Sequence, residues 1–185
     1  MRRAIFLDRD GVINENRADY VKSWEEYRFL PGVFSPLKRL AQSPFIIIVI
    51  TNQSAINRGL VTRSEVEEIH RRMLEEIRAH GGRVDAIFYC PHRPDENCDC
   101  RKPKPGLLLQ AAERFDIDLS RSYLIGDALS DIVAGLAVGC YPILVLTGRG
   151  REQLPLLQAG AYNGYHVAPD LQRAVEWILA REGID

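Results

Sequence analysis

The sequence predicts an α/β protein with a doubly wound parallel sheet of the Rossmann-like type. Short apolar runs alternate with segments of helical periodicity, which is the pattern of strands joined by crossover helices. Asp8, Thr51 and Asp127 each follow the end of one of these apolar runs. Because ligands of open parallel sheets bind beyond the carboxyl ends of the strands, we expect these side chains to converge on one edge.

The apolar runs predict the strands, and the periodic segments predict the helices. Residues 45–50 are apolar on both faces and rich in isoleucine, so this run is expected to be a central strand. Thr62 and Glu65 have the spacing of a capping box at the start of a helix. The expected strands are 4–7, 45–50, 86–89, 122–125, 142–146 and, at an edge, 166–167. The expected helices are 31–42, 62–80, 106–115, 130–138, 151–158 and 171–181.

The size and charge of the chain limit its organisation and its partners. A chain of 185 residues fits a single domain, which we place at 1–185 with a loop inserted at 90–105. The 24 Lys and Arg residues nearly balance the 25 Asp and Glu residues, so no overall field favours nucleic acid or an anionic membrane. The sequence contains neither a membrane-spanning apolar run nor a secretory signal. We therefore expect a soluble, cytoplasmic monomer.

The most specific feature is the pair of carboxylates Asp8 and Asp10, followed by Gly11. Taken alone, Asp-x-Asp-Gly is more typical of a turn or a calcium-type loop. At the end of a buried strand, however, a carboxylate can attack a phosphate ester if a cation such as Mg²⁺ neutralises their repulsion. Asp8 would then carry the phosphoryl group, and Asp10 would protonate the leaving oxygen and later activate water.

Other strand ends supply the remaining groups that phosphoryl transfer needs. Asp127 would be the distant third carboxylate for the metal, and Asp131, one helical turn later, would help to orient it. Thr51 and the amides that follow it are suited to holding phosphoryl oxygens, although such a stretch alone is more often a simple turn. Arg101 and Lys102 add positive charge before a helix, although alone they would indicate a solvated basic loop.

Three of the four cysteines lie within a short Pro-rich and Asn-containing loop. Cys90, His92, Cys98 and Cys100 supply three thiolates and one imidazole, a complete tetrahedral set for structural Zn²⁺. Because such a set leaves no position open for water, this metal is expected to support the fold rather than the reaction. Cys140 stands apart in an apolar stretch and is interpreted as a buried hydrophobic residue.

Taken in order, these segments resemble the motifs of the haloacid dehalogenase superfamily of phosphotransferases. Within it, Asp-Arg-Asp-Gly-Val-Ile-Asn, Thr-Asn-Gln-Ser, Cys-Pro-His with Cys-Asp-Cys-Arg-Lys-Pro, and Gly-Asp-x-x-x-Asp are similar to the D-glycero-D-manno-heptose 1,7-bisphosphate and histidinol-phosphate phosphatase family. The resemblance covers residues 5–131. It implies a haloacid dehalogenase fold without a large cap domain, and removal of the 7-phosphate from the heptose bisphosphate, with histidinol phosphate as the alternative substrate.

The resemblance also implies a role for each matching residue. Asp8 is the expected nucleophile and Asp10 the acid and base, while Thr51 and Lys102 stabilise the phosphoryl group. The expected magnesium ligands are Asp8, Asp10 and Asp127. The residues expected to contact the substrate are Asn16, Asp19, Tyr20, Asn52, Gln53, Ser54 and Arg101.

The sequence departs from the family pattern at two positions near these motifs. Ala55 stands where the family usually has glycine, and Ala128 stands where a lysine often follows the aspartate. Two other classes of protein remain as alternatives, a DNA 3′-phosphatase of the same superfamily and a signalling domain that stores phosphate on an aspartate. The charge balance argues against a zinc-containing nucleic-acid-binding module, but the fold alone leaves the DNA 3′-phosphatase open. Asp10 argues against the signalling domain, because it places a base beside the phosphoaspartate.

Overall fold

The computed structural model describes residues 1–184, which form a six-stranded parallel sheet in the order β3-β2-β1-β4-β5-β6. The order reverses direction between β1 and β4, as in a doubly wound fold, so the predicted fold class is confirmed. The strands are β1 (Ala4–Leu7), β2 (Ile46–Asn52), β3 (Ala86–Cys90), β4 (Tyr123–Gly126), β5 (Tyr141–Val145) and β6 (His166–Ala168).

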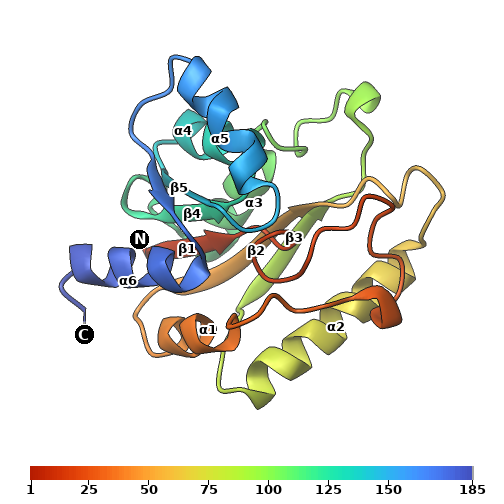
Figure 1. Ribbon diagram of the computed structural model, residues 1–185, viewed down its shortest axis with the longest axis horizontal. Coiled ribbons are helices and arrows are strands. Elements are labelled where there is room, and N and C mark those ends of the chain that lie inside the picture. The colour runs from red at the N-terminus through yellow and green to blue at the C-terminus, as the bar shows by residue number, and fades with distance from the viewer. Residues whose placement is uncertain (185) are drawn as a thin grey trace.

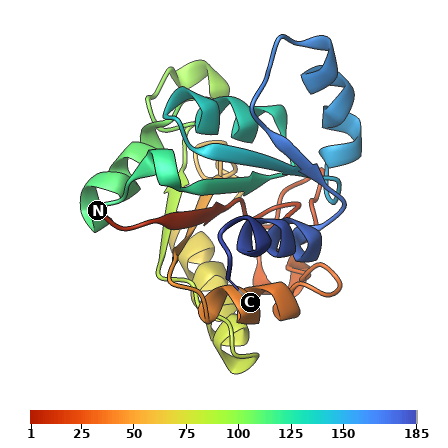
Figure 2. The same ribbon diagram turned by 90° about the vertical axis from the view of Figure 1, so that its left-hand side faces the viewer.

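Helices cover both faces of the sheet (Figures 1 and 2). On one face lie α1 (Phe34–Ala41), α2 (Arg63–Ala79) and α6 (Leu171–Arg181). On the other lie α3 (Gly106–Phe115), α4 (Leu129–Ala137) and α5 (Gly150–Ala159). Successive side chains of a strand point to opposite faces, so Ile5 and Leu7 of β1 enter one hydrophobic core and Phe6 enters the other.

The buried strands are apolar along their whole length because both of their faces are covered. Residues 46–50 of β2 are each at most 3% exposed. A strand that is buried on both faces has no polar side to alternate with its apolar side. This explains why the unbroken apolar run predicted a central strand, and β2 indeed lies between β1 and β3.

The boundaries of some elements differ from those predicted. Helix α1 begins at Phe34 rather than at residue 31, because Pro31 and Gly32 form a turn in which Gly32 has a φ of +74°. Strand β2 continues to Asn52, so Thr51 lies inside the strand. The capping box of α2 is confirmed, since the Thr62 hydroxyl accepts a hydrogen bond from the Glu65 amide.

Three one-turn 3-10 helices were not predicted from the sequence. They are η1 (Trp24–Glu26), η2 (Pro94–Glu96) and η3 (Leu119–Arg121). A three-residue element is too short to show a hydrophobic period, so the sequence carries no signal for it.

Residues 1–184 include no large cap domain over the carboxyl ends of the strands, as the sequence predicted. The additions at this edge are the segment from residue 14 to residue 30 and the loop at 90–105, and both are short (Figure 1). None of the helices in the described part of the chain has the length and apolar character that crossing a membrane requires.

Candidate active site

Two carboxylates meet at the carboxyl ends of neighbouring strands. Asp8 directly follows β1 and Asp127 directly follows β4. The two strands pair in parallel with Leu7 beside Ile125, and the Asp8 amide donates a hydrogen bond to the Ile125 carbonyl at 2.9 Å. The register of the sheet therefore brings together two residues that are far apart in the sequence.

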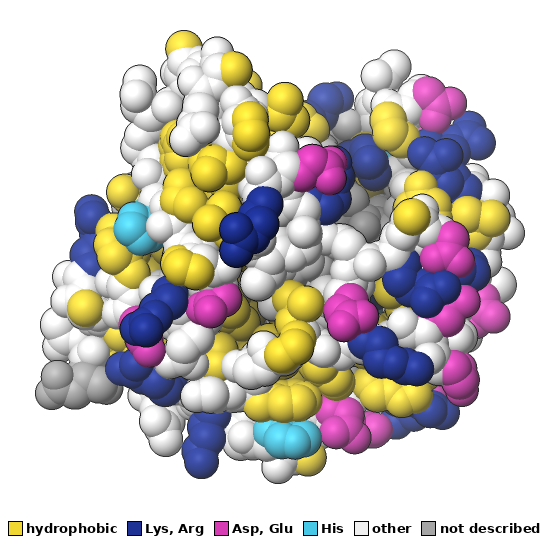
Figure 3. Space-filling view, in the orientation of Figure 1, with side chains coloured by type: hydrophobic (Ala, Val, Ile, Leu, Met, Phe, Trp, Pro, Cys, Tyr) yellow, Lys and Arg dark blue, Asp and Glu magenta, His cyan; other side chains and the backbone are white. Residues whose placement is uncertain are grey.

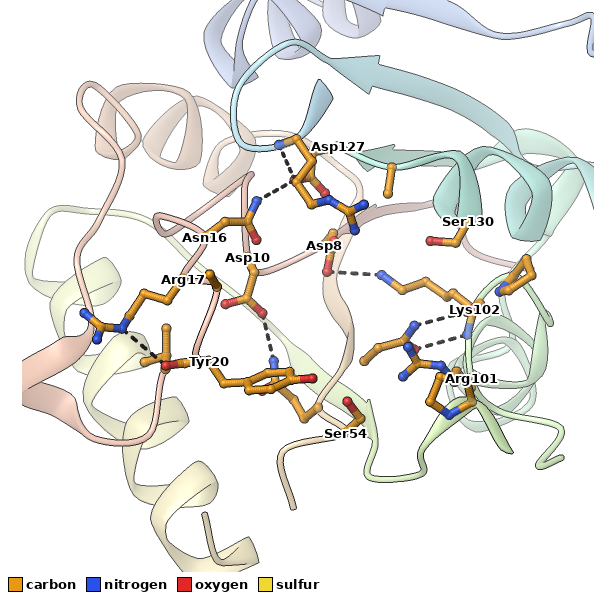
Figure 4. A pocket seen from close by; sticks show the side chains of 18 of the residues that line it. Asp8, Asp10, Asn16, Arg17, Tyr20, Ser54, Arg101, Lys102, Asp127 and Ser130 are labelled. Atoms are coloured by element: carbon orange, nitrogen blue, oxygen red, sulfur yellow. Dashed lines mark hydrogen bonds and ion pairs between the residues drawn. The ribbon is translucent and has the colours of Figure 1, made fainter. Parts of the chain in front are cut away.

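Lys102 places a buried positive charge against this pair. Its Nζ lies 3.1 Å from Asp8 Oδ1 and 2.7 Å from Asp131 Oδ1, and it donates a hydrogen bond to the Ile50 carbonyl at 3.1 Å. Burial alone would lower the pKa of this ammonium, but the charges of Asp131 and Asp8 outweigh burial and raise it. Lys102 therefore stays charged, directed at Asp8 (Figure 4).

Asp8, Asp127 and Asp131 form a compact group of carboxylates that could hold a metal ion. One oxygen from each lies within 4.8 Å of the others, and all three residues are buried. Burial raises the pKa of Asp8, against the effect of Lys102, and burial together with the charge of Asp131 raises the pKa of Asp127 to about 6. A divalent cation with oxygen ligands, such as Mg²⁺, fits this donor set and would favour the ionised carboxylates.

The Asp10 side chain lies outside this group of three and is held by different partners. Asp10 Oδ1 accepts hydrogen bonds from Arg9 Nη2 and Asn14 Nδ2, each at 3.0 Å, and Oδ2 accepts one from Gln53 Nε2 at 2.9 Å. Burial would raise the pKa of Asp10, but the Arg9 charge and these hydrogen bonds together lower it. The pKa values of Asp8 and Asp10 are therefore shifted in opposite directions, although one residue separates them.

Asp127 is oriented by two loops that approach it closely. Its Oδ2 accepts hydrogen bonds from Asn16 Nδ2 at 2.8 Å and from the Arg149 amide at 2.9 Å. Both loops contain a glycine with positive φ, and a Cβ on Gly11 or Gly148 would lie 1.9 or 2.4 Å from the same oxygen. Glycine at both positions is what permits this approach.

These side chains line a cavity of about 770 Å³ beyond the sheet edge. In Figure 3 the surface is hollowed between the region of α5 and the loop at 90–105, and Lys and Arg side chains gather along this hollow. Figure 4 shows Asp8 and Asp10, from the segment that follows β1, and Lys102, from the loop at 90–105, directed into the cavity. The predicted site residues that line it are Asp8, Asp10, Asn16, Tyr20, Asn52, Gln53, Ser54, Arg101, Lys102 and Asp127.

Two residues that were predicted for the site are not among those that line the cavity. Thr51 is fully buried, and its hydroxyl accepts a hydrogen bond from Gln53 Nε2 at 2.9 Å. Asp19 is exposed and bonds to Arg17 and Lys22. Both therefore contact residues near the cavity rather than the cavity itself.

Several residues that line the cavity were not predicted from the sequence. Arg149 follows the carboxyl end of β5, so the rule that found Asp8 and Asp127 could have found it. Arg17 and Arg58 lie in irregular segments, where the sequence has no periodic signal to place them. Ser130 and Glu152 complete the missed polar lining, and both lie in the first turn of a helix.

A second possible metal centre lies in the loop at 90–105. One ligand atom from each of Cys90, His92, Cys98 and Cys100 lies within 4.8 Å of the others. His92 Nδ1 is 3.3 Å from the sulfurs of Cys90 and Cys100, and the sulfurs of Cys90 and Cys98 are 3.6 Å apart, too far for a disulfide. The predicted set of ligands is thus assembled, and three sulfurs with one imidazole nitrogen suit Zn²⁺.

The cysteine cluster is connected directly to Lys102, the lysine that faces Asp8. The Arg101 amide donates a hydrogen bond to Cys98 Sγ at 3.3 Å. The Asn52 side chain then holds the Lys102 backbone, donating to its carbonyl and accepting from its amide, each at 3.1 Å. The conformation of the loop therefore determines where Lys102 enters the site.

The chain is similar to known phosphatases in both sequence and structure. The HAD-hydrolase-like family model matches residues 99–174. In structure, the chain is similar to D,D-heptose 1,7-bisphosphate phosphatase from B. bronchiseptica, which was solved in complex with magnesium and phosphate. The TM-score is 0.91 at 42% identity, and the match covers 97% of this chain and 99% of that one. The phosphatase from Burkholderia thailandensis gives a TM-score of 0.75 at 34% identity, covering 97% and 99% of the two chains.

Sequence relatives then define the family. The D-glycero-beta-D-manno-heptose-1,7-bisphosphate 7-phosphatase of Bordetella bronchiseptica is 42% identical, over 96% of this chain and 98% of the relative. The Pseudomonas aeruginosa enzyme of the same name is 45% identical, over 83% and 86%. The chain therefore belongs to the haloacid dehalogenase-like phosphatases, in the family of the D-glycero-beta-D-manno-heptose-1,7-bisphosphate 7-phosphatases. It is an enzyme that hydrolyses phosphate monoesters.

The cysteine cluster predicts a tightly held zinc ion. Elemental analysis of the purified protein is expected to find about one zinc per chain, because thiolate-rich sites with four ligands hold zinc strongly. Cys98→Ser should lose the zinc and lower the melting temperature. Cys140→Ala is the control, since this buried cysteine lies outside the cluster and its variant should keep the zinc. The assignment would be wrong if the purified protein contained no zinc and Cys98→Ser left the melting temperature unchanged.

Proposed function

We propose that this chain removes the 7-phosphate of D-glycero-D-manno-heptose 1,7-bisphosphate through a phosphoaspartate on Asp8. The observation that carries the proposal is the contact between Asp8 and the buried ammonium of Lys102 at the cavity. This contact occurs in a chain 42% identical to a phosphatase named for that substrate. The name of that relative specifies the beta anomer, and we extend the anomer to this chain as well.

In the first half of the reaction, an Asp8 oxygen attacks the phosphorus and the bond from phosphorus to the ester oxygen breaks. The proposed acid, Asp10, gives its proton to the departing sugar oxygen, which would otherwise leave as an unstable alkoxide. The Lys102 ammonium stabilises the negative charge on the phosphoryl oxygens. The products of this half are the free sugar hydroxyl and the phosphoaspartate.

In the second half, water attacks the phosphorus of the phosphoaspartate. Asp10, now ionised, takes a proton from this water, and the bond from phosphorus to Asp8 breaks. Inorganic phosphate leaves and the Asp8 carboxylate is restored. The lowered pKa of Asp10 suits this second role, and its first role requires that Asp10 take up a proton as the negatively charged phosphate binds beside it.

The metal that we assign to the carboxylates is Mg²⁺, which the similar Bordetella structure contains. We propose that Asp8 and Asp127 would hold it through their carboxylates, while Asp131 pairs with Lys102. Asp10 would be the third ligand through its main-chain carbonyl, because its carboxylate is already held by hydrogen bonds. When bound, Mg²⁺ would neutralise the repulsion between the Asp8 carboxylate and the phosphate dianion. In the Cys90 cluster, Zn²⁺ would be structural.

The charge around the cavity suits a substrate with two phosphates. Four arginines line it in addition to Lys102, namely Arg17, Arg58, Arg101 and Arg149. They could neutralise a second phosphate that does not react. We propose that the polar residues contact the sugar, that Thr51 orients Gln53, and that Asp19 orients Arg17. The polar residues proposed to contact the sugar are Asn16, Tyr20, Asn52, Gln53 and Ser54.

We also propose that residues 1–185 form a single phosphatase domain, acting as a monomer in the cytoplasm. The near-neutral charge of the chain supports a small-molecule partner over nucleic acid.

A panel of phosphate esters tests the proposed substrate. We expect kcat/KM for the heptose 1,7-bisphosphate to exceed that for histidinol phosphate by at least about a hundredfold, because the arginines of the cavity add contacts to its second phosphate. A heptose 7-phosphate without the second phosphate is the matched comparison. A 3′-phosphorylated DNA strand is expected to be a poor substrate. The substrate assignment would be wrong if histidinol phosphate or the DNA were preferred.

Asp8→Asn tests the covalent mechanism. The amide has almost the same shape as the carboxylate but is not a nucleophile, so we expect turnover to fall below detection while the melting temperature stays close to that of the unmodified protein. Mass spectrometry after mixing with substrate should find the phosphoryl adduct on the unmodified protein and not on the variant. Residual turnover within about tenfold of the parent would argue against attack by Asp8.

Lys102 and Arg101 are expected to differ in their kinetic effects. Lys102→Met should lower kcat by about a hundredfold or more, because the ammonium faces the phosphoryl group that is transferred. Arg101→Met should mainly raise KM, because Arg101 lines the cavity and does not contact Asp8. Steady-state kinetics on the heptose bisphosphate separates the two effects. An equal rise in KM for both variants, with kcat unchanged, would contradict the assigned roles.

A further inference from the structure

Arg9 is a buried cation that lies beside the active site but is not among the residues that line the cavity. Its side chain is 1% exposed, although it follows Asp8 directly and precedes Asp10. Within residues 1–184, the carboxylate within 4.0 Å of its guanidinium is that of Asp10. The guanidinium does not line the cavity, and of the residues that it contacts, Asp10 is the one that does.

His70 of α2 holds the other end of the same guanidinium. Arg9 Nη1 lies 3.1 Å from His70 Nε2, and His70 is buried. Because a guanidinium can only donate hydrogen bonds, Nε2 must be the acceptor, which requires a neutral imidazole with its proton on Nδ1. Burial and the adjacent Arg9 charge also lower the pKa of His70 to about 3, in agreement with this geometry.

The guanidinium is enclosed on a third side by the ring of Tyr27, whose centroid lies 5.9 Å from the Arg9 Cζ. Tyr27 follows η1, so Arg9 joins the segment at 14–30 to α2. The Arg9 Nε and the Tyr27 hydroxyl are buried without a hydrogen-bond partner among the described residues. Arg9 is therefore fixed by its two Nη atoms, one on His70 and one on Asp10.

We propose that Arg9 and His70 are positioning residues for Asp10, together aiming its carboxylate at the ester oxygen and at the attacking water. The inference rests on the proposed function, in which Asp10 moves both protons. Asn14 and Gln53 also bond to Asp10, but Asn14 lies in isolated bridges and Gln53 just after β2, so neither belongs to a helix or a strand. The Arg9–His70 contact is the link from Asp10 to a long helix with a buried face. Since misplacing a reacting group by about 1 Å can cost on the order of a hundredfold in rate, such a link matters.

His70→Leu tests the proposal without removing Arg9, whose loss would leave the partly buried Asp10 carboxylate without its ion-pair partner and endanger folding. We expect kcat on the heptose bisphosphate to fall about tenfold, with KM changed by less than about twofold, because substrate contacts are untouched. His70→Gln should recover most of kcat, since its amide oxygen can accept the hydrogen bond from Arg9. Ile77→Val, a buried change further along α2, is the control for general loosening of the helix.

Hydrolysis of p-nitrophenyl phosphate distinguishes a positioning role of His70 from a purely structural one, because only the positioning role predicts a burst of product. Its leaving group departs as a stable anion and needs no proton from Asp10, whereas hydrolysis of the phosphoaspartate still needs Asp10 as base. His70→Leu should therefore show a burst of about one nitrophenolate per enzyme, which is absent from Ile77→Val. If His70→Leu matches Ile77→Val in kcat and burst while the unmodified protein is active, the positioning role is wrong and the proposed function stands. An unmodified protein without phosphatase activity would overturn both.

Discussion

The structure of the active site depends on the burial of the Lys102 ammonium. An isolated ammonium inside a protein is strongly unfavourable, so its position is tied to the groups that compensate it. Those groups come from three different elements: Asp8 after β1, the Ile50 carbonyl of β2, and Asp131 in α4. Any shift of these elements would leave a charge without its partner. The same contacts that stabilise Lys102 in the fold therefore also fix the distance between the proposed nucleophile and the charge that assists it.

This dependence explains why a cysteine-rich loop lies so close to the proposed catalytic groups. Lys102 is two residues from Cys100, a distance of at most about 7 Å along the chain, so the cysteine cluster restricts where the lysine backbone can lie. Asn52 at the end of β2 restricts it from the other side by two hydrogen bonds. The loop has little regular structure of its own, and a metal is an effective way to order such a segment. The stability of the loop and the position of the Lys102 charge therefore depend on the same contacts.

Side chains at the carboxyl ends of parallel strands converge on one edge of the sheet, and this rule predicted Asp8 and Asp127 from the sequence. Tertiary contacts determine how the other residues of the site are placed. Asp8, Asp127 and Lys102 were predicted because strand ends and motif spacing are local properties of the chain. The position of Asp131 at Lys102, with Asp10 held apart by Arg9, depends on side-chain partners that no pattern encodes. Thr51 is buried because β2 continues past it to Asn52. Arg149 also follows a strand end, but it lies four residues beyond β5 rather than directly after it.

The two departures from the family pattern have different consequences once their surroundings are known. Ala55 is fully buried and packs with Val61 and Val66, so its extra methyl group is accommodated in a small hydrophobic cluster. Ala128 lines the cavity, and its amide donates a hydrogen bond to Asp131 Oδ2 at 3.2 Å. Without a long side chain at this position, positive charge on this side of the cavity comes from Arg149, whose amide bonds to Asp127. Of the two residues, Ala128 is therefore the one at the cavity, whereas Ala55 belongs to the hydrophobic interior.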